Sequence, residues 1–240
     1  MSSLFSKIAL ATYRGVGMAL YPFMGPLLRY RASRGKEERT RRYERYGYPS
    51  ADKPKGPIVW FHAASVGESM AAIALVEHVH SLGINTIMTT GTVTSAQLMR
   101  ERLPKSSFHQ YVPLDLQPAM ERFLDHWQPD LAIFTESEIW PTTIMELAKR
   151  KIPPVLINAR MSERSFKLWN KSKAVGQTIF DKFSYVIAQS EGDATRFKRL
   201  GARPVDLTGN IKTNTDPMPY DEAERDQLAA AISGRPVWIA

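Results

Sequence analysis

The sequence contains no cysteine among its 240 residues. This absence excludes a disulfide framework and a thiolate metal site, and it suits a reducing compartment without proving one. The five histidines show no metal-ligand spacing backed by nearby acids, so we expect no metal site. Long apolar runs are also missing. The uncharged part of the apolar N-terminal segment covers only residues 15–28, whereas a membrane-spanning helix needs about 20 apolar residues.

Three common ligand-binding signatures do not occur in the chain. There is no G-x-G-x-x-G after the first predicted strand, no G-x-x-x-x-G-K-[ST] and no G-x-S-x-G. A dinucleotide site, a P-loop and a nucleophile elbow therefore have little support, and we expect no cofactor. The composition is 43% hydrophobic, which is enough for the core of one large domain.

Residues 1–48 are predicted to form an amphipathic helix followed by a basic segment. Lys7 and Arg14 lie seven positions apart and share one helical face, which leaves apolar residues such as Phe5 and Ile8 to project elsewhere. This pattern is typical of a helix that lies in the plane of a membrane interface. The alternative is a hydrophobic helix that docks on its own domain or on a partner.

Lysine and arginine are concentrated in residues 29–45, which hold eight of them against three glutamates. Such a run requires an anionic neighbour or solvent, and anionic lipid, a phosphorylated substrate and nucleic acid are the candidates. No aromatic platform of the single-strand-binding kind accompanies the run, so we expect no nucleic acid partner. An anionic membrane surface is the favoured partner of this segment.

From residue 55 onward, short β-branched or aromatic runs alternate with helical patterns. This alternation predicts a doubly wound α/β domain, with a parallel sheet covered by helices on both faces. The predicted strands are residues 58–63, 85–90, 108–112, 130–135, 155–158, 185–189 and 205–208. The predicted helices are residues 68–82, 94–103, 117–126, 139–150, 171–183 and 191–200.

The last part of the chain, residues 217–240, has a different pattern. A proline-containing linker precedes a charged helix predicted near residues 221–232, and residues 236–240, PVWIA, have the character of an opening strand. A domain rarely ends on an opening buried strand. We therefore expect this sequence to be the first half of a longer protein.

Polar side chains are expected at the carboxyl ends of the strands, where ligands of open α/β sheets bind. The mixture found there, with acids at two strand ends, a guanidinium at a third and an ammonium at a fourth, suits a sugar acceptor that carries phosphates. Polar loops and helix caps are the alternative explanation. The candidate residues of this edge are Ser65, Gly67, Glu68, Thr90, Gly91, Glu136, Glu138, Arg160, Asn210 and Lys212.

Glu68 is the most informative of these residues. An apolar strand runs into a turn in which Ser65 and Gly67 are expected to place this carboxylate at a helix start, where it could act as a base. The spacing of Ser65 and Glu68 is also that of a capping box, and spacing alone favours the cap. Thr135 and Glu138 have the same spacing, and a cap is again favoured for Glu138.

Five motifs, in register, resemble one enzyme family. They are WFHAASVGE (residues 60–68), TESEIWP (135–141), NARMSERS (158–165), AQSEGDATRFKRLGA (188–202) and TGNIK (208–212). Over nearly its whole length the chain resembles the amino-terminal half of a 3-deoxy-D-manno-octulosonic acid (Kdo) transferase. The resemblance implies a GT-B glycosyltransferase of two Rossmann-like domains. Residues 49–216 would be the acceptor domain, and residues 217–240 the linker, a helix and the first strand of the donor-binding domain.

The resemblance also implies a reaction and a location. The family moves Kdo from CMP-Kdo to a lipid A precursor with inversion, without a required metal, during lipopolysaccharide assembly at the cytoplasmic face of the bacterial inner membrane. Glu68 matches the proposed general base and Glu136 a second important carboxylate. Arg160 and Lys212 would bind phosphate or carboxylate groups. The loop at residues 89–97 and the residues after Lys212 depart from the family pattern.

Two other hypotheses remain open at this point. The chain could belong to a GT-B transferase that uses another nucleotide sugar, which a donor panel would reveal. It could also be a non-enzymatic peripheral membrane-binding module whose polar crevice is only a set of helix caps. If the chain is the acceptor half of a Kdo transferase, it is expected to be inactive by itself, because the donor-binding domain is missing.

Overall fold

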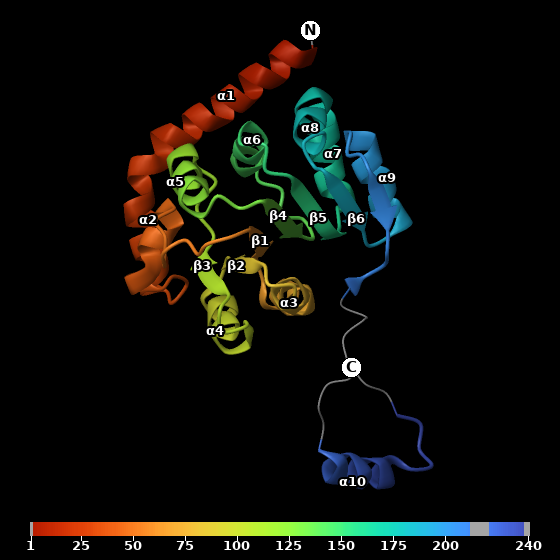
Figure 1. The fold of residues 1–240 in the computed structure, drawn as a ribbon. Coiled ribbons are helices and arrows are strands. Elements are labelled where there is room, and N and C mark those ends of the chain that lie inside the picture. The colour runs from red at the N-terminus through yellow and green to blue at the C-terminus, as the bar shows by residue number, and fades with distance from the viewer. Residues whose placement is uncertain (1, 212–220, 238–240) are drawn as a thin grey trace.

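The computed structural model describes residues 2–211 and 221–237. In these residues, seven strands form one parallel sheet in the order β3-β2-β1-β4-β5-β6-β7, with helices on both faces (Figure 1). The predicted doubly wound α/β fold is therefore confirmed. The strands are β1 (Ile58–Ala63), β2 (Asn85–Thr90), β3 (Phe108–Tyr111), β4 (Leu131–Thr135), β5 (Pro154–Ala159), β6 (Tyr185–Ala188) and β7 (Val205–Leu207).

The central strands are recognisable in the sequence because both of their faces are buried. All six residues of β1 are buried, and its neighbours β2 and β4 each have only one residue that is not. A strand covered on both sides is a continuous apolar run rather than an alternating one. All seven predicted strands are present, with differences of one or two residues at their ends.

Two layers of helices cover the sheet. On one face, α3 (Val66–Ser81) and α4 (Val93–Arg102) pack on a core that includes Phe61, Val76 and Met88. The opposite face has a larger core around Trp60, Trp127 and other aromatic residues. The helices on this side are α5 (Gln117–Trp127), α6 (Pro141–Lys149), α7 (Glu163–Lys171), α8 (Lys173–Phe180) and α9 (Glu191–Leu200).

The helix predictions needed two corrections. The helix predicted at residues 171–183 is the shorter α8, and Ser172, at φ −110°, ψ 54°, separates it from a preceding helix, α7. The sequence reading missed α7, which begins where the Ser162 side chain accepts a hydrogen bond from the Ser165 amide. The helix predicted from residue 139 begins at Pro141, because a proline fits the first helical position, where its missing N–H is not needed.

Beyond the sheet, α10 (Glu222–Ile232) confirms the charged helix predicted near residues 221–232 and has no buried residue. Residues 212–220, which contain Lys212 and most of the predicted linker, lie outside the described residues. So do residues 238–240 of the strand predicted at residues 236–240, while Pro236 and Val237 are not in a strand.

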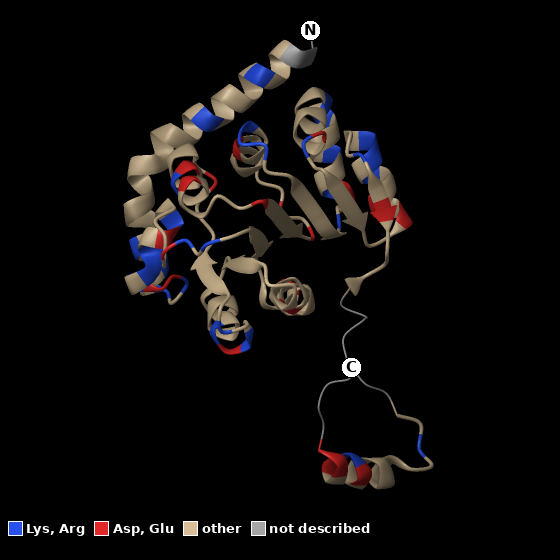
Figure 2. Ribbon diagram, viewed as in Figure 1, with Lys and Arg blue, Asp and Glu red and all other residues tan. Residues whose placement is uncertain are grey.

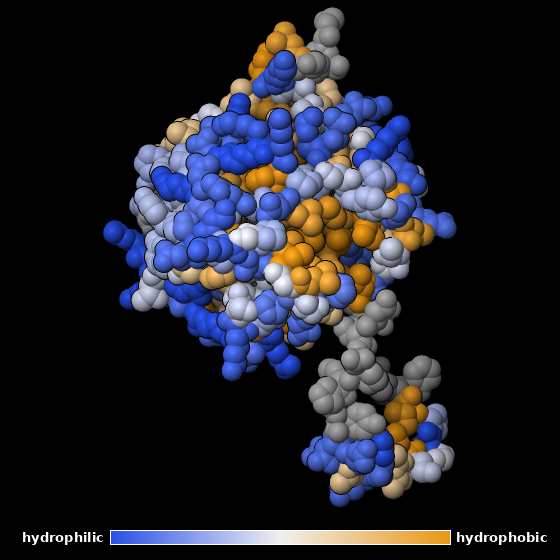
Figure 3. All heavy atoms as spheres, in the orientation of Figure 1, coloured by the Kyte–Doolittle hydropathy of each residue, from blue (hydrophilic) through white to orange (hydrophobic). Residues whose placement is uncertain are grey.

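The N-terminal helix α1 (Ser2–Leu20) docks on its own domain and also presents an apolar outer face. It lies against α5 and α8, Leu10 is buried, and the Tyr13 hydroxyl donates a 3.0 Å hydrogen bond to Asp115 (Figure 1). Figure 3 shows apolar side chains exposed at the projecting end of α1, where Phe5 and Ile8 are each 57% exposed. Within residues 2–211 and 221–237, no helix has the length and apolar character needed to cross a bilayer.

The basic segment is only partly a surface feature. It follows α1 and includes η1 (Tyr21–Phe23), α2 (Met24–Ser33) and η2 (Arg39–Tyr46). Figure 2 shows many Lys and Arg positions, in blue, along this part of the ribbon. Arg31, Arg41 and Arg45 form ion pairs with Glu37 and Glu44 of the same segment. The expectation of an external anion or solvent is therefore wrong for Arg41 and Arg45, whose side chains are 17% and 6% exposed, whereas Arg31 also faces solvent.

Candidate active site

The two strands β1 and β4 define the switch point of the sheet, because the chain proceeds outward from them in opposite directions. In doubly wound folds, ligands bind beside such a point, beyond the carboxyl ends of the strands. Glu68 follows β1, while Glu136 and Glu138 follow β4. The structure thus brings the three predicted acids to the same part of the sheet edge.

Glu68 is a partly exposed carboxylate held by three donors. The Ser65 hydroxyl bonds to its Oε1 at 2.7 Å, while the Ala64 amide and the Thr135 hydroxyl each bond to its Oε2 at 3.0 Å. The Glu68 amide in turn donates to the Ser65 hydroxyl. The predicted capping box is therefore present. The hydrogen bond from Thr135 is not part of the capping box. It links the Glu68 carboxylate, which follows β1, to the end of β4.

A chain of hydrogen bonds runs from the buried Arg45 to Glu68. The Arg45 guanidinium donates to the Gly91 carbonyl at 2.7 Å, and the Gly91 amide donates to the Ala64 carbonyl at 3.3 Å. The Ala64 amide then donates to Glu68. Arg45 also bonds to the Val112 carbonyl, so one guanidinium fixes the ends of β2 and β3 beside the switch point.

Glu138 does not form the cap predicted for it. Its amide bonds to the Thr135 carbonyl at 3.2 Å, but its Oε2 faces His62 Nε2 at 3.2 Å and accepts from Trp140 Nε1 at 2.8 Å. Burial opposes ionisation of this carboxyl, but the hydrogen bonds from His62 and Trp140 hold the pKa of Glu138 below its ordinary value. The capping prediction is wrong, because the Thr135 hydroxyl is used by Glu68.

His62 is buried at the end of β1, as the sequence indicated. Its Nδ1 lies 3.1 Å from the Thr89 carbonyl oxygen, which can only accept. Nδ1 also lies 3.0 Å from the Thr89 hydroxyl, and Nε2 faces Glu138 at 3.2 Å. His62 therefore links the end of β2 to Glu138 beside the switch point.

Glu136 and Arg160 are brought together by their backbones. The Glu136 amide donates to the Ile157 carbonyl, and the Arg160 amide donates to the Glu136 carbonyl at 3.2 Å. Glu136 has a φ of 53°, a left-handed conformation that is uncommon for a non-glycine residue and often marks a functional position. Arg160 is exposed, so its charge is available at the edge where Glu136 lies.

The remaining predicted site residues have different surroundings. Thr90 is fully buried and its hydroxyl lies 3.0 Å from His109 Nε2, so it does not face the edge. Gly91 does, and an added Cβ would come within 3.0 Å of the Ala64 carbonyl oxygen, which explains the glycine. Gly67 lies in the first turn of α3 rather than in the turn before it. Asn210 is half-buried after β7, and Lys212 lies outside the described residues.

A cavity of about 290 Å³ opens beside these acids, between α2 and the ends of β1, β2 and β4. This cavity was not predicted from the sequence, because α2 covers one side of it and residues far along the chain form the other side. The TESEIWP motif contained one signal, since Trp140 belongs to the wall. The lining consists of Leu27, Leu28, Arg31, Glu37, Arg45, Trp60, His62, Ala64, Gly91, Val112, Pro113, Leu114, Asp115, Phe134, Glu138, Trp140 and Thr143.

The functional groups at this edge of the sheet are the carboxylates of three glutamates and the guanidinium of Arg160. Across residues 2–211 and 221–237, no three His, Asp or Glu side chains gather as metal ligands. The doubly wound parallel sheet, with carboxylates after its first and fourth strands and an exposed arginine nearby, agrees with the fold that the resemblance to a GT-B glycosyltransferase predicted.

Solved structures share this fold at low sequence identity. A putative UDP-N-acetylglucosamine 2-epimerase from Listeria monocytogenes superimposes with a TM-score of 0.52 and 9% identity, covering 71% of this chain and 50% of that one. The S. aureus MnaA–UDP co-structure gives a TM-score of 0.50 and 12% identity, with 71% and 51% covered. These likenesses support the fold.

Sequence comparison identifies the family. Residues 40–215 match the model of the 3-deoxy-D-manno-octulosonic-acid transferase (kdotransferase) family. The chain is 37% identical over 227 residues to the 3-deoxy-D-manno-octulosonic acid transferase of Rickettsia bellii, covering 94% of this chain and 54% of that protein. It is 36% identical over 230 residues to the enzyme of that name from Haemophilus influenzae, with 91% and 52% covered. This chain belongs to the Kdo transferase family, and it spans about half the length of these relatives.

Proposed function

We propose that the complete protein transfers Kdo from CMP-Kdo to a lipid A precursor and inverts the anomeric configuration. The single observation that carries this proposal is the position of Glu68, a partly exposed carboxylate at the switch point of a domain of this family. The chain described here supplies the acceptor side. The donor would be bound by the half of the protein that the relatives have in addition.

Glu68 acts as the general base in this proposal. Its carboxylate accepts the proton of an acceptor hydroxyl while the hydroxyl oxygen attacks the anomeric carbon of Kdo, and the bond from that carbon to the CMP phosphate breaks. The donors from Ser65, Ala64 and Thr135 hold the carboxylate in one orientation. A positioned base typically contributes about 10²- to 10⁴-fold to a rate.

Glu136, Arg160 and Lys212 have binding roles in the proposal. Arg160 is exposed beside Glu136, and a guanidinium binds phosphate or carboxylate groups through paired hydrogen bonds. Lys212 follows in the chain after β7 and is assigned to the same anionic groups from its motif. Glu136 would contact a hydroxyl of one of the two sugars.

The test is a transfer assay on the complete protein with a panel of nucleotide sugars. CMP-Kdo with a lipid A precursor is expected to give an acceptor product heavier by one or more Kdo units in mass spectrometry. Transfer from a different nucleotide sugar alone would replace the proposed donor. Absence of any transfer, with lipid binding retained, would favour the non-enzymatic membrane-binding module.

We further propose that the protein attaches to the cytoplasmic face of the bacterial inner membrane through the outer face of α1 and α2. Phe5 and Ile8 are each 57% exposed, and Phe23 is 65% exposed. The exposed Lys7 and Arg14 lie on the same helix. Apolar side chains flanked by cations suit an anionic interface.

Vesicle flotation tests the attachment. Phe5→Ser with Ile8→Ser is expected to reduce binding to vesicles of anionic phospholipid at least several-fold. Leu82→Ser is the matched control, because Leu82 is 62% exposed at the end of α3, on the other face of the sheet. Equal flotation of all three proteins would contradict attachment through α1.

A further inference from the structure

The cavity beneath α2 is not explained by the proposed transfer reaction alone. Its volume of about 290 Å³ is near the lower limit of pockets that hold small molecules. Side chains of α2 cover it, and the ends of β1 and β4 form its floor. The cavity therefore lies at the carboxyl edge of the sheet, and one of its lining residues, Ala64, bonds to the proposed catalytic carboxylate of Glu68.

The charged side chains in the cavity wall are already bonded within the protein. Asp115 accepts hydrogen bonds from the amides of Thr142 and Thr143 at the start of α6. Arg45 is paired with Glu37 and with two backbone carbonyls. Such groups lose little by being covered, because their hydrogen-bonding capacity is met from within the protein.

Apolar side chains make up the rest of the wall. Leu28, Trp60 and Phe134 are almost completely buried and line the cavity, and Val112 and Leu114 contribute from the segment after β3. A polar ligand would find few unused partners on these surfaces, whereas a hydrocarbon would replace water at them. The lining therefore selects for an apolar occupant.

The cavity is continuous with the apolar outer face of the N-terminal helices. Leu27 lines the cavity and is also 46% exposed. Phe23 lies one turn before it and is 65% exposed. Leu27 and Phe23 thus offer an apolar chain a route from a membrane surface at α1 and α2 to the cavity.

The other end of the cavity lies next to Glu68. Ala64 belongs to the lining, and its amide is one of the donors to the Glu68 carboxylate. A molecule with its apolar part in the cavity would have its polar part at the strand ends. This is the arrangement that a lipid with a reacting sugar hydroxyl requires.

We propose that the cavity beneath α2 binds an acyl chain of the lipid acceptor. The proposal rests on the proposed function, from which it takes the acceptor as a lipid, and it adds the place where the protein recognises the hydrocarbon. Acyl-chain binding here anchors the acceptor and orients its sugar toward Glu68. It predicts that acceptor affinity depends on chain length.

A fluorescent fatty acid tests the cavity directly. 11-(Dansylamino)undecanoate is added below its micelle concentration to the 240-residue chain, and the increase in dansyl fluorescence gives a dissociation constant. Val112→Trp and Leu28→Trp fill the cavity from two different sides and are expected to weaken binding at least tenfold. Circular dichroism checks the fold of each variant. If Leu28→Trp does not fold, Val112→Trp still tests the proposal, because Val112 is only partly buried.

The controls separate the cavity from other binding modes. Leu82→Trp adds the same side chain on an exposed position and is expected to leave the dissociation constant unchanged. Dansylglycine, which lacks the long chain, is expected not to bind. Unchanged affinity in both cavity variants, or equal binding of dansylglycine, would overturn the proposal.

A second assay distinguishes failure of this inference from failure of the proposed function. In the complete protein, Val112→Trp is expected to raise the KM for the acylated acceptor at least tenfold, with kcat changed less than twofold. An unchanged KM with normal transfer would overturn the acyl-chain site and leave the proposed function intact. The dansyl experiment needs no transfer, so it retains its meaning even if Kdo is not the transferred sugar.

Discussion

Two groups of carboxylates lie near the carboxyl edge of the sheet, and they are balanced in different ways. One group belongs to the basic segment and is called the basic-segment cluster. In it, Glu37 and Glu44 are buried and paired with Arg45 and Arg41. At the switch point, Glu68 is partly exposed, and the hydrogen-bond donors that it receives from residues 2–211 and 221–237 are neutral. The comparison teaches that the first two carboxylates are paired with guanidinium groups and hold the structure together, whereas Glu68 is oriented by neutral donors, as the proposed role of a base requires.

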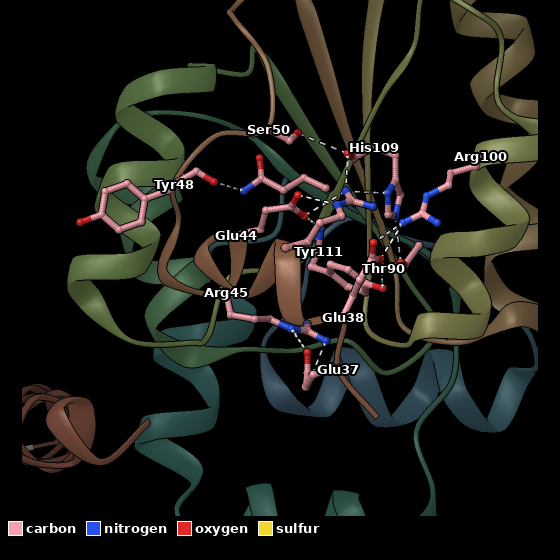
Figure 4. Close-up of polar contacts among 12 residues, drawn as sticks. Glu37, Glu38, Glu44, Arg45, Tyr48, Ser50, Thr90, Arg100, His109 and Tyr111 are labelled. Carbon is pink, nitrogen blue, oxygen red and sulfur yellow. Dashed lines mark hydrogen bonds and ion pairs between the residues drawn. The ribbon is translucent and has the colours of Figure 1, made fainter. Parts of the chain in front are cut away.

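The basic-segment cluster connects parts of the chain that are far apart in the sequence (Figure 4). Glu44 accepts from the Tyr111 amide at 2.7 Å, and Glu38 accepts from Arg100 and from the Tyr111 hydroxyl. Burial raises the pKa of Glu44 even though hydrogen bonds from Arg41 and Tyr111 oppose the rise. The cluster fixes η2 against β3, and through Arg45 it reaches the switch point.

The largest effect is expected from Glu68→Gln in the complete protein. Glutamine keeps the capping spacing but cannot accept the proton, so transfer should fall about 10²- to 10⁴-fold while the melting temperature changes little. Initial transfer rates and thermal unfolding measure the two effects. Full activity of the variant would remove Glu68 as the base and erase the distinction between the two groups of acids.

Arg45→Met is expected to give the largest loss of stability. It removes the buried one of the two arginines that pair with Glu37, leaving only the more exposed Arg31, and it removes the donor to the Val112 and Gly91 carbonyls. Breaking such a buried pair costs about 3 kcal/mol of the free energy of unfolding. Arg39→Met is the matched control, because Arg39 is exposed in the same segment, and it should change that energy by less than about 0.5 kcal/mol. Urea unfolding followed by circular dichroism compares them, and equal midpoints would contradict a structural role for the cluster.

The acid stability of the protein is expected to depend on His109. Burial, together with Arg41 and other nearby arginines, lowers the pKa of His109 from 6.5 to about 3. The unfolded chain therefore binds more protons than the folded one between these values, so the contribution of His109 to stability is complete above pH 6.5 and is lost as the pH falls toward 3. His109→Gln should flatten the dependence of the unfolding midpoint on pH in this window. The raised pKa of Glu44 acts in the opposite direction, and a slope unaffected by the substitution would refute this assignment.

Ser65→Ala is expected to have a modest effect on stability and on transfer, and it sharpens the comparison at the switch point. The loss of an N-cap costs about 0.5–2 kcal/mol. If the Ser65 hydroxyl also orients Glu68, transfer by the complete protein should fall several-fold with little change in the KM for the acceptor. Ser162→Ala, the equivalent cap of α7, should cost similar stability with no loss of transfer. Equal transfer by both variants would reduce Ser65 to a cap.

The sheet and the position of Glu68 were predictable from local sequence. Strands buried on both faces appear as apolar runs, and a serine three residues before a glutamate marks a helix start. Both signals depend on neighbouring residues. The predictions of β1 and of the capping box at Ser65 succeeded for this reason.

Contacts between distant residues were not predictable in this way. Arg100 and Glu38 are 62 positions apart, and Tyr13 and Asp115 are 102 apart. No local pattern therefore shows that the basic run is partly buried or that α1 docks against α5 and α8. The role of Glu138 was missed for the same reason, since His62 lies 76 positions away. The cavity depends on where α2 crosses the strand ends, which only the folded chain reveals.

The most direct test of this account is a crystal structure of the complete protein with a lipid A precursor bound. The account predicts that one acceptor hydroxyl lies within about 2.6–3.2 Å of a Glu68 carboxylate oxygen. A bound acceptor whose hydroxyls all lie out of reach, with the Glu68 carboxylate facing only Ser65, Ala64 and Thr135, would contradict it.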